Sequence, residues 1–514
     1  MDAHVPQRAE VDRVIFNDLR SESSPPRATA ITWLPAVLAL HALVWTLAAW
    51  LSRGNLDRAG DMVENYVWGI EWQAGYFKHP PLFAWVTAAW FSVMPRTDWA
   101  YFALSALNAG VGLLGVAALA RRFLSSEGAA FAALALAVSP FYTVMAIKFN
   151  ANAVLLSVWP WTAAAFVAFM QDGRRRHAAA CGALAALALL GKYFSVVLVL
   201  GLVLAALVIP NWRQRLRGAG LWLALAAGLV VLMPHLLWMF DHQFSTLRFA
   251  SQRSAGSLGP ALLRLASYTV AQAGYLLPSA IFLLWAVPGS RRREAASLLV
   301  GAIARPALHR ELWWLALAPM FVVGAIAALA GTPMASVWGM AQWFAITALW
   351  VAVLGQRGIV PRVQWLRGAL PVVWLAVLAI ASAVGIYEAR RGSATAIEPR
   401  AELAQVAHAL WTGRTGRALP SVGGSFVEAL SIAFYAPGKT RWWNPMAPAT
   451  TPWISRADWR REGGLLVCAV GDDDCHRSAR AEGAAAPIEV SVHKKSWGMT
   501  LPVHTYSLYL VLPE

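Results

Sequence analysis

Runs of about 20 apolar residues recur along this sequence from Ile31 to Ile386. A run of that length crosses the hydrocarbon core of a bilayer as a helix, which satisfies its own backbone hydrogen bonds in lipid. The charged share of 14% is also too small for a soluble chain of 514 residues. The sequence therefore predicts a mainly α-helical polytopic membrane protein.

Eleven spans are predicted, and they divide the chain into three parts. A polar arm covers residues 1–30, a membrane domain with a long first loop at 52–98 covers 31–387, and residues 388–514 contain no run long enough to span. The predicted spans are 31–51, 99–120, 127–147, 150–170, 178–192, 194–209, 219–240, 265–287, 311–330, 335–354 and 369–387. An odd number of spans places the two termini on opposite sides.

Sixteen arginines lie in five of the connecting loops, and these loops alternate with loops that are nearly uncharged or mixed in charge. By the positive-inside rule, the arginine loops and the N-terminus are cytoplasmic in an inner (cytoplasmic) membrane. The first loop and the C-terminal domain are then periplasmic. This distribution accounts for the net charge of +16, so no nucleic-acid partner is expected.

The first outer loop holds four of the 27 acidic residues within Asp57–Glu71. Asp61 and Glu64 would share one face of a helix, and carboxylates beside a bilayer are costly without a partner or a function. The basic run Lys78-His79-Pro80-Pro81 follows, and then Leu82–Phe91, which is too short to cross and is predicted as an interfacial helix. This order favours a site for an anionic lipid and a nucleophile. The alternative is a capped surface helix with a proline-started neighbour.

Further cations lie in the other loops predicted to be outside. They are Lys148 between spans three and four, Lys192 with Tyr193 between spans five and six, and Arg248 after span seven. Lysine and arginine bind phosphate through charge-assisted hydrogen bonds. The alternative is that Lys148, Lys192 and Arg248 reach to lipid headgroups without any specific ligand.

The first outer loop, GDMVENYVWGIEWQAGYFKHPPLFAW, resembles that of the family 39 glycosyltransferases, and KFNANAVLLSVWP, GKYFSVVLVL and PHLLW resemble bacterial members. This family comprises the protein mannosyltransferases that use dolichyl-phosphate mannose and their bacterial relatives, including the aminoarabinose transferase of lipid A. The resemblance covers roughly residues 31–250. It implies a GT-C fold with an outer cavity for a polyprenyl-phosphate sugar.

The sequence also departs from the family pattern. The mannosyltransferases have adjacent Asp-Glu, whereas two residues separate Asp61 and Glu64 here. The aminoarabinose group has an acidic residue before Lys-Pro-Pro, whereas this chain has Lys78-His79 before the prolines. Neither mannose nor aminoarabinose is therefore carried over as the donor sugar.

The resemblance implies an inverting transfer of a hexose or pentose from a polyprenyl phosphate to an envelope lipid, glycan or protein. Asp61 would be the general base, with Glu64 orienting the acceptor or sharing a divalent metal, for which the sequence has no dedicated ligand cluster. Lys78, His79, Lys148, Lys192, Tyr193 and Arg248 would hold the phosphate. The alternatives are a transporter or flippase of lipid-linked sugar and a lipid-binding scaffold.

The segment 388–514 is predicted to be a small α/β domain. Helices are expected at Glu398–Trp411 and Ser425–Tyr435, and strands at Gly464–Val470, Ile488–Val492 and Thr505–Val511. Its two cysteines, Cys468 and Cys475, are predicted to form a disulfide, because the domain would lie outside the cytoplasm and no matching second pair of metal ligands follows.

Overall fold

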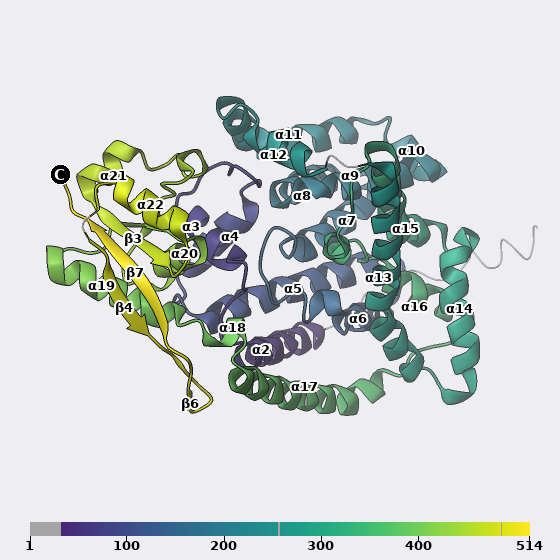
Figure 1. Cartoon of the computed structure of the whole chain (residues 1–514). Coiled ribbons are helices and arrows are strands. Elements are labelled where there is room, and N and C mark those ends of the chain that lie inside the picture. The colour runs from purple at the N-terminus through teal and green to yellow at the C-terminus, as the bar shows by residue number, and fades with distance from the viewer. Residues whose placement is uncertain (1–31, 255–256, 485) are drawn as a thin grey trace, which may run out of the picture.

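The computed structural model describes residues 32–254, 257–484 and 486–514. They form a helical domain and, at one end of it, a small C-terminal domain built on a β-sheet (Figure 1). The predicted fold class, a helical membrane protein with a small C-terminal α/β domain, is confirmed. The polar arm predicted at residues 1–30 lies outside the described residues.

Six of the described helices contain a segment that is long and apolar enough to cross a membrane, so the chain is a multi-pass membrane protein. These helices are α2 (Leu34–Ser52), α5 (Asp98–Ala120), α11 (Ala219–Asp241), α13 (Leu258–Ala286), α15 (Arg310–Ala330) and α17 (Val363–Arg391).

The other five predicted spans correspond to shorter helices. They are α6 (Ser126–Ala137), α7 (Leu155–Asp172), α8 (Arg175–Gly191), α9 (Val196–Val208) and α16 (Ile346–Gln356). Three of these spans also include a short 3-10 helix: η1 (Pro140–Tyr142), η2 (Tyr193–Ser195) or η5 (Ser336–Ala341). The span containing α6 breaks at Pro140, because proline disfavours a helical backbone at the residue before it.

Some stretches predicted as loops contain short helices. They are α10 (Pro210–Arg215), α12 (Ser245–Ser254), η3 (Gly289–Arg291), α14 (Arg292–Ala304) and η4 (Pro306–Leu308). The first outer loop contains α3 (Asp61–Gly69) and α4 (Leu82–Phe91). The predicted interfacial helix matches α4, which begins directly after Pro81 because proline has the φ angle of a helix start.

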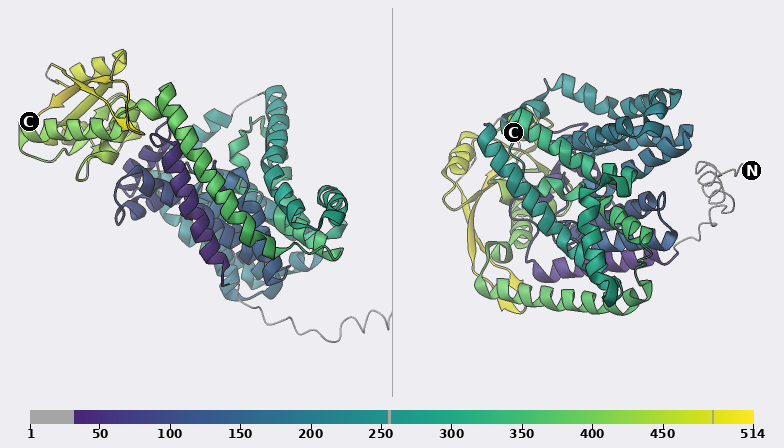
Figure 2. Two further views of the ribbon diagram at one scale, coloured as in Figure 1. Left: turned by 90° about the horizontal axis from the view of Figure 1, so that it is seen from below. Right: turned by 90° about the vertical axis from the view of Figure 1, so that its right-hand side faces the viewer.

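The last long helix, α17, packs beside the first, α2 (Figures 1 and 2). The chain therefore enters the C-terminal domain close to the place where it left α2 for the first outer loop. The short helix α18 (Ala394–Ile397) connects the two domains, and Gly54 has no room for a side chain because Ala396 lies against it.

The C-terminal domain has a five-stranded sheet in the order β2-β1-β3-β7-β4. Strands β2 (Arg441–Trp442), β1 (Ser421–Gly424) and β3 (Gly464–Ala469) are parallel, whereas β7 (His504–Val511) runs antiparallel to β3 and to β4 (Ile488–Val492). The helices are α19 (Arg400–Thr415), α20 (Phe426–Tyr435), η6 (Pro448–Thr450), α21 (Arg456–Glu462) and α22 (Asp473–Ala481), and β5 (Lys495–Ser496) pairs with β6 (Met499–Thr500). Cys468 of β3 and Cys475 of α22 form a disulfide.

Candidate active site

The site is built on the N-terminus of α3, which follows a turn capped by Asp57. One carboxylate oxygen of Asp57 accepts the backbone N–H of Asp61 at 3.0 Å, and the other accepts that of Met62 at 2.8 Å. A carboxylate at this place satisfies N–H groups that a helix start leaves unbonded, and it also interacts favourably with the helix dipole. These two hydrogen bonds fix the start of α3 and, with it, the position of the backbone that carries the Asp61 side chain.

Lys148 bridges the two aspartates. Its Nζ lies 3.0 Å from Asp57 Oδ2 and 2.8 Å from Asp61 Oδ2. Burial raises the pKa of Asp61, but the hydrogen bond and charge of Lys148, together with the charge of Lys78, outweigh it and hold that pKa below its usual value. Asp61 is therefore a carboxylate at neutral pH. Its side chain is 38% exposed and can reach a ligand.

Glu64 lies one turn further along α3 and is almost fully buried. Its Oε2 forms an ion pair with Lys78 Nζ at 2.7 Å, whereas its buried Oε1 has no hydrogen-bond partner among the described residues. Burial raises the pKa of Glu64 to about 7, against the charge of Lys78, which lowers it. The free oxygen can accept a hydrogen bond from a ligand.

Lys192 differs from the other two lysines of the site. Its Nζ donates to Asn152 Oδ1 at 2.6 Å and lies 4.7 Å from the centre of the Trp338 ring. Within the described part of the chain, it forms no ion pair with a carboxylate. An ammonium group that is partly removed from water and has no carboxylate in direct contact is costly. Lys192 is therefore the cation of this site that is available to an anionic ligand.

Tyr193 is held by His235, a histidine of α11. Its hydroxyl lies 2.7 Å from His235 Nε2, and His235 Nδ1 lies 2.7 Å from the carbonyl oxygen of Ala74. Since a carbonyl only accepts, His235 donates from Nδ1 and, in its neutral form, accepts the Tyr193 proton at Nε2. The oxygen of Tyr193 can still accept a hydrogen bond from a ligand.

Two adjoining cavities meet at these groups. The larger, about 420 Å³, is lined by Asp61, Lys78, His79, Asn152, Lys192, Tyr193, Phe194, Val196, Phe249, Ile326, Thr332, Met334 and Trp338. The smaller, about 70 Å³, is lined by Asp61, Glu64, Asn65, Lys78, His79, Asn150, Ala151, Asn152 and Lys192. Asp61 and Lys192 line both, so a ligand that occupies the two cavities passes between a carboxylate and an ammonium group that has no ion-paired carboxylate among the described residues.

The structure brings together most of the site residues predicted from sequence. Asp61, Glu64, Lys78, His79, Lys192 and Tyr193 line one or both cavities. Lys148 contacts Asp61 but is engaged by two carboxylates. Arg248 is not among the lining residues; it lies on α12 and donates to Gln243 at 3.4 Å on the exposed surface. Its neighbour Phe249 is the residue of α12 that lines the larger cavity.

Sequence reasoning missed the roles of Asp57 and Trp338. Aspartate is a common capping residue, so its place shortly before the helix that carries Asp61 could have suggested that Asp57 caps the helix start. No local signal pointed to Trp338, which comes from the 3-10 helix η5, far along the chain from Lys192. Sharing of a divalent metal by Asp61 and Glu64 is an alternative left open by the sequence; Lys148 and Lys78 each bind one oxygen of these carboxylates and would repel such a cation. Within the described residues, no group of three or more His, Cys, Asp and Glu is placed to hold a metal.

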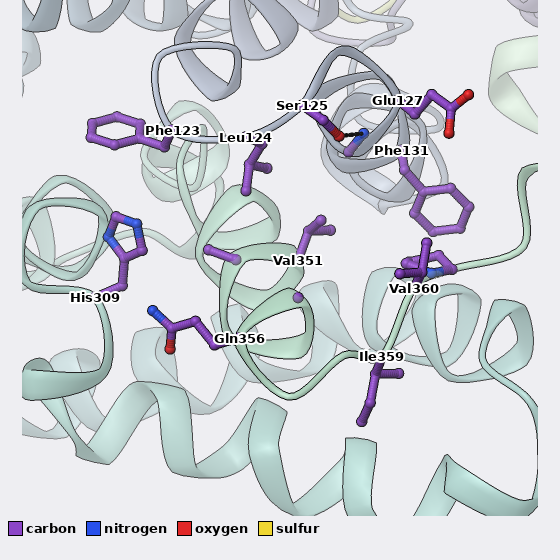
Figure 3. Close-up of a pocket in the computed structure, with 14 residues that line it drawn as sticks. Phe123, Leu124, Ser125, Glu127, Phe131, His309, Val351, Gln356, Ile359 and Val360 are labelled. Carbon is purple, nitrogen blue, oxygen red and sulfur yellow. Dashed lines mark hydrogen bonds between the residues drawn. The ribbon is translucent and has the colours of Figure 1, made fainter. Parts of the chain in front are cut away.

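A separate cavity of about 360 Å³ lies between α6, α16 and the start of α15 (Figure 3). It is lined mainly by apolar residues, with Glu127, His309 and Gln356 as its larger polar side chains. Its walls combine ends of these helices with residues of the loops that the arginine pattern assigns to the cytoplasmic side. None of the predicted site residues lines it.

Comparisons with known proteins fit this fold. Residues 78–238 match the family model described as dolichyl-phosphate-mannose-protein mannosyltransferase. The lipid A galacturonosyltransferase RgtD of Rhizobium johnstonii is 29% identical over 234 residues, 44% of this chain and 48% of RgtD, so the match spans about half the length of that relative.

Two solved structures have the same fold. ArnT from Cupriavidus metallidurans bound to undecaprenyl phosphate has a TM-score of 0.51 at 16% identity, covering 94% of this chain and 99% of ArnT. The apo state of ArnT gives 0.50 at 17% identity, covering 93% and 98%.

The resemblance expected from the first outer loop is therefore confirmed: part of the chain matches the mannosyltransferase family model, and the chain has the GT-C fold of ArnT.

Proposed function

We propose that this protein transfers one sugar from a polyprenyl-phosphate donor to a lipid, glycan or protein acceptor at the outer face of the cytoplasmic membrane, with inversion at the anomeric carbon. The observation that carries this proposal is Lys192, a half-buried cation that forms no ion pair within the described residues and lies in the wall of a cavity that also holds the ionised Asp61. An anionic phosphate beside Lys192 and a nucleophile beside Asp61 would complete the site.

The proposed reaction is a single displacement. The acceptor oxygen forms a bond to the anomeric carbon while the bond from that carbon to the phosphate oxygen breaks, and the proton of the acceptor hydroxyl moves to Asp61. The polyprenyl phosphate leaves with the bonding electron pair. Lys192, with Lys78 and His79 lining the same cavity, stabilises the charge that develops on it.

The contacts suggest different tasks for the three lysines. Lys148 is engaged by Asp57 and Asp61, so its task is to keep Asp61 ionised. Lys78 is partly neutralised by Glu64, which leaves Lys192 as the main phosphate ligand. The free oxygen of Glu64 would accept a hydrogen bond from a hydroxyl of the donor or acceptor in the smaller cavity.

The relatives support a lipid-linked donor. One ArnT structure carries undecaprenyl phosphate, and RgtD is named as a transferase acting on lipid A. For this chain, the arginine pattern supports an active site on the periplasmic side.

The test is a defined mixture of purified protein, a series of undecaprenyl-phosphate sugars and envelope extracts, with products identified by mass spectrometry. Asp61→Asn should abolish transfer and retain binding of undecaprenyl phosphate, because the amide cannot take the proton. Transfer by Asp61→Asn at the wild-type rate would contradict the role of Asp61 as base. Movement of intact donor across vesicles without any glycosylated product would favour a flippase.

A further inference from the structure

The C-terminal domain reaches the turn that positions Asp61. We infer that Arg400, from the first helical turn of α19 in this domain, is a positioning residue for the Asp57–Asp61 turn. The domain would then be part of the catalytic apparatus, not only a docking module. The inference rests on the proposed role of Asp61, but its structural part can be tested without any activity.

Arg400 makes a buried contact with the turn. Its side chain is 4% exposed, and Nη1 donates to the backbone carbonyl oxygen of Asp57 at 3.0 Å. The other guanidinium nitrogens bind Glu398 Oε2 at 2.9 and 2.6 Å, which fixes the orientation of the planar group. The carbonyl oxygen of Glu398 in turn accepts the side-chain amide of Asn55 at 2.9 Å.

Lys494 adds a further link to the same side of the turn. Its ammonium group donates to the carbonyl oxygen of Gly54 and, at 3.1 Å, to Asn55 Oδ1. Residues 54, 55 and 57 are thus each bonded to the C-terminal domain, immediately before the helix that carries Asp61.

The position of Asp57 determines that of Asp61 through two connections. The Asp57 carboxylate holds the N–H groups at the start of α3, and Lys148 joins the same carboxylate to Asp61. A shift of the Asp57 backbone would therefore move both the helix start and the lysine that keeps Asp61 ionised. Contacts of this kind hold catalytic groups in their productive geometry.

The far end of the first outer loop contacts the C-terminal domain without any involvement of Arg400. Arg441 of β2 binds Glu71 through two hydrogen bonds of 2.8 and 2.7 Å, and Phe434 of α20 packs edge-on against Tyr66 at 5.2 Å between ring centres. Because these contacts do not involve Arg400, its replacement should loosen the Asp57–Asp61 turn without releasing the domain.

The experiment compares Arg400→Met and Arg400→Lys with Arg456→Met, whose arginine pairs with Glu482 within the C-terminal domain at 2.7 Å. Hydrogen exchange of the full chain should show faster exchange at the amides of Asp61 and Met62 in Arg400→Met, slightly faster exchange in Arg400→Lys, and no change there in Arg456→Met. Unchanged exchange in Arg400→Met would overturn the inference, whether or not the protein proves to be a glycosyltransferase.

The kinetic arm uses transfer from undecaprenyl-phosphate sugar. Arg400→Met should lower kcat by roughly 10- to 100-fold with little change in the KM for donor. It should also move the acid limb of the kcat profile to higher pH, because a looser Lys148 contact raises the pKa of Asp61. Arg400→Lys should recover part of the rate. A loss of rate that only follows the loss of folded protein, with an unmoved pH profile, would reduce Arg400 to a structural role.

Discussion

Replacement of Lys192 by methionine should change donor affinity and protein stability in opposite directions. Methionine has nearly the length of lysine and no charge, so the cavity wall keeps its shape. Lys192 is half-buried beside Trp338 and hydrogen-bonded to Asn152, and within the described residues it forms no ion pair with a carboxylate. The charge therefore costs folding free energy in the empty protein and contributes binding free energy when an anion is present.

The magnitudes follow from the contacts that are lost. A hydrogen bond to a charged group contributes about 1.5–3 kcal/mol, so Lys192→Met should weaken binding of a lipid phosphate by about 10- to 150-fold. Removing the unpartnered charge should stabilise the empty protein by about 1–3 kcal/mol, after allowing about 1 kcal/mol for the hydrogen bond that Asn152 loses. The expected rise in Tm is on the order of a few degrees.

The assay is thermal unfolding of the purified protein in detergent, with and without undecaprenyl phosphate. Wild type should gain stability on addition of the lipid, whereas Lys192→Met should start from a higher Tm and gain much less. Lys148→Met is the matched control, because that lysine is paired with Asp57 and Asp61 and its loss should lower the Tm. A lower Tm for Lys192→Met without lipid, together with an unchanged response to lipid, would refute the reasoning.

Two further predictions concern protonation and the disulfide. Because the pKa of Glu64 is raised to about 7 from an ordinary value of 4.5, the folded protein binds more protons at this group than the unfolded chain between these pH values. Glu64 should therefore make the free energy of unfolding fall as pH rises through that window. Glu64→Gln should remove this part of the fall, which urea titrations at several pH values measure. The same dependence of unfolding free energy on pH in both proteins would contradict the prediction. Cys468 and Cys475 are seven positions apart, and replacing both by serine removes the disulfide that closes the loop between them. This should lower the free energy of unfolding of the C-terminal domain by about 2–3 kcal/mol. Unfolding of the domain measures the loss, and reduction of the disulfide in the wild type should give the same value.

Long-range patterns in the sequence predicted the membrane domain well. Apolar runs identify α5 and α11 within a few residues, because the thickness of a bilayer imposes a length on a spanning helix. The interfacial helix α4 was placed at its observed bounds, since two prolines mark its start. The span that contains α16 was less accurate: its first part is the 3-10 helix η5, which hydropathy cannot distinguish from an α-helix.

The C-terminal domain and the site show where local patterns fail. Strand β2 has only two residues and β1 only four, so neither gives an alternating signal, although both lie in the main sheet. The carboxylates and lysines of the site were found because charges are rare beside apolar runs. Arg400 and Asp57 are 343 positions apart in the sequence, and neither periodicity nor residue spacing predicts a contact over that separation.

The pairing of α17 with α2 has a consequence for biosynthesis. The segment that carries Arg400 follows α17, which packs beside α2, the helix that precedes the Asp57–Asp61 turn, yet the ribosome makes this segment hundreds of residues after the turn. A nascent chain therefore inserts its first outer loop before the C-terminal contacts to it exist. If Asp61 acts as we propose, activity would begin only at the end of assembly, when α17 has packed against α2.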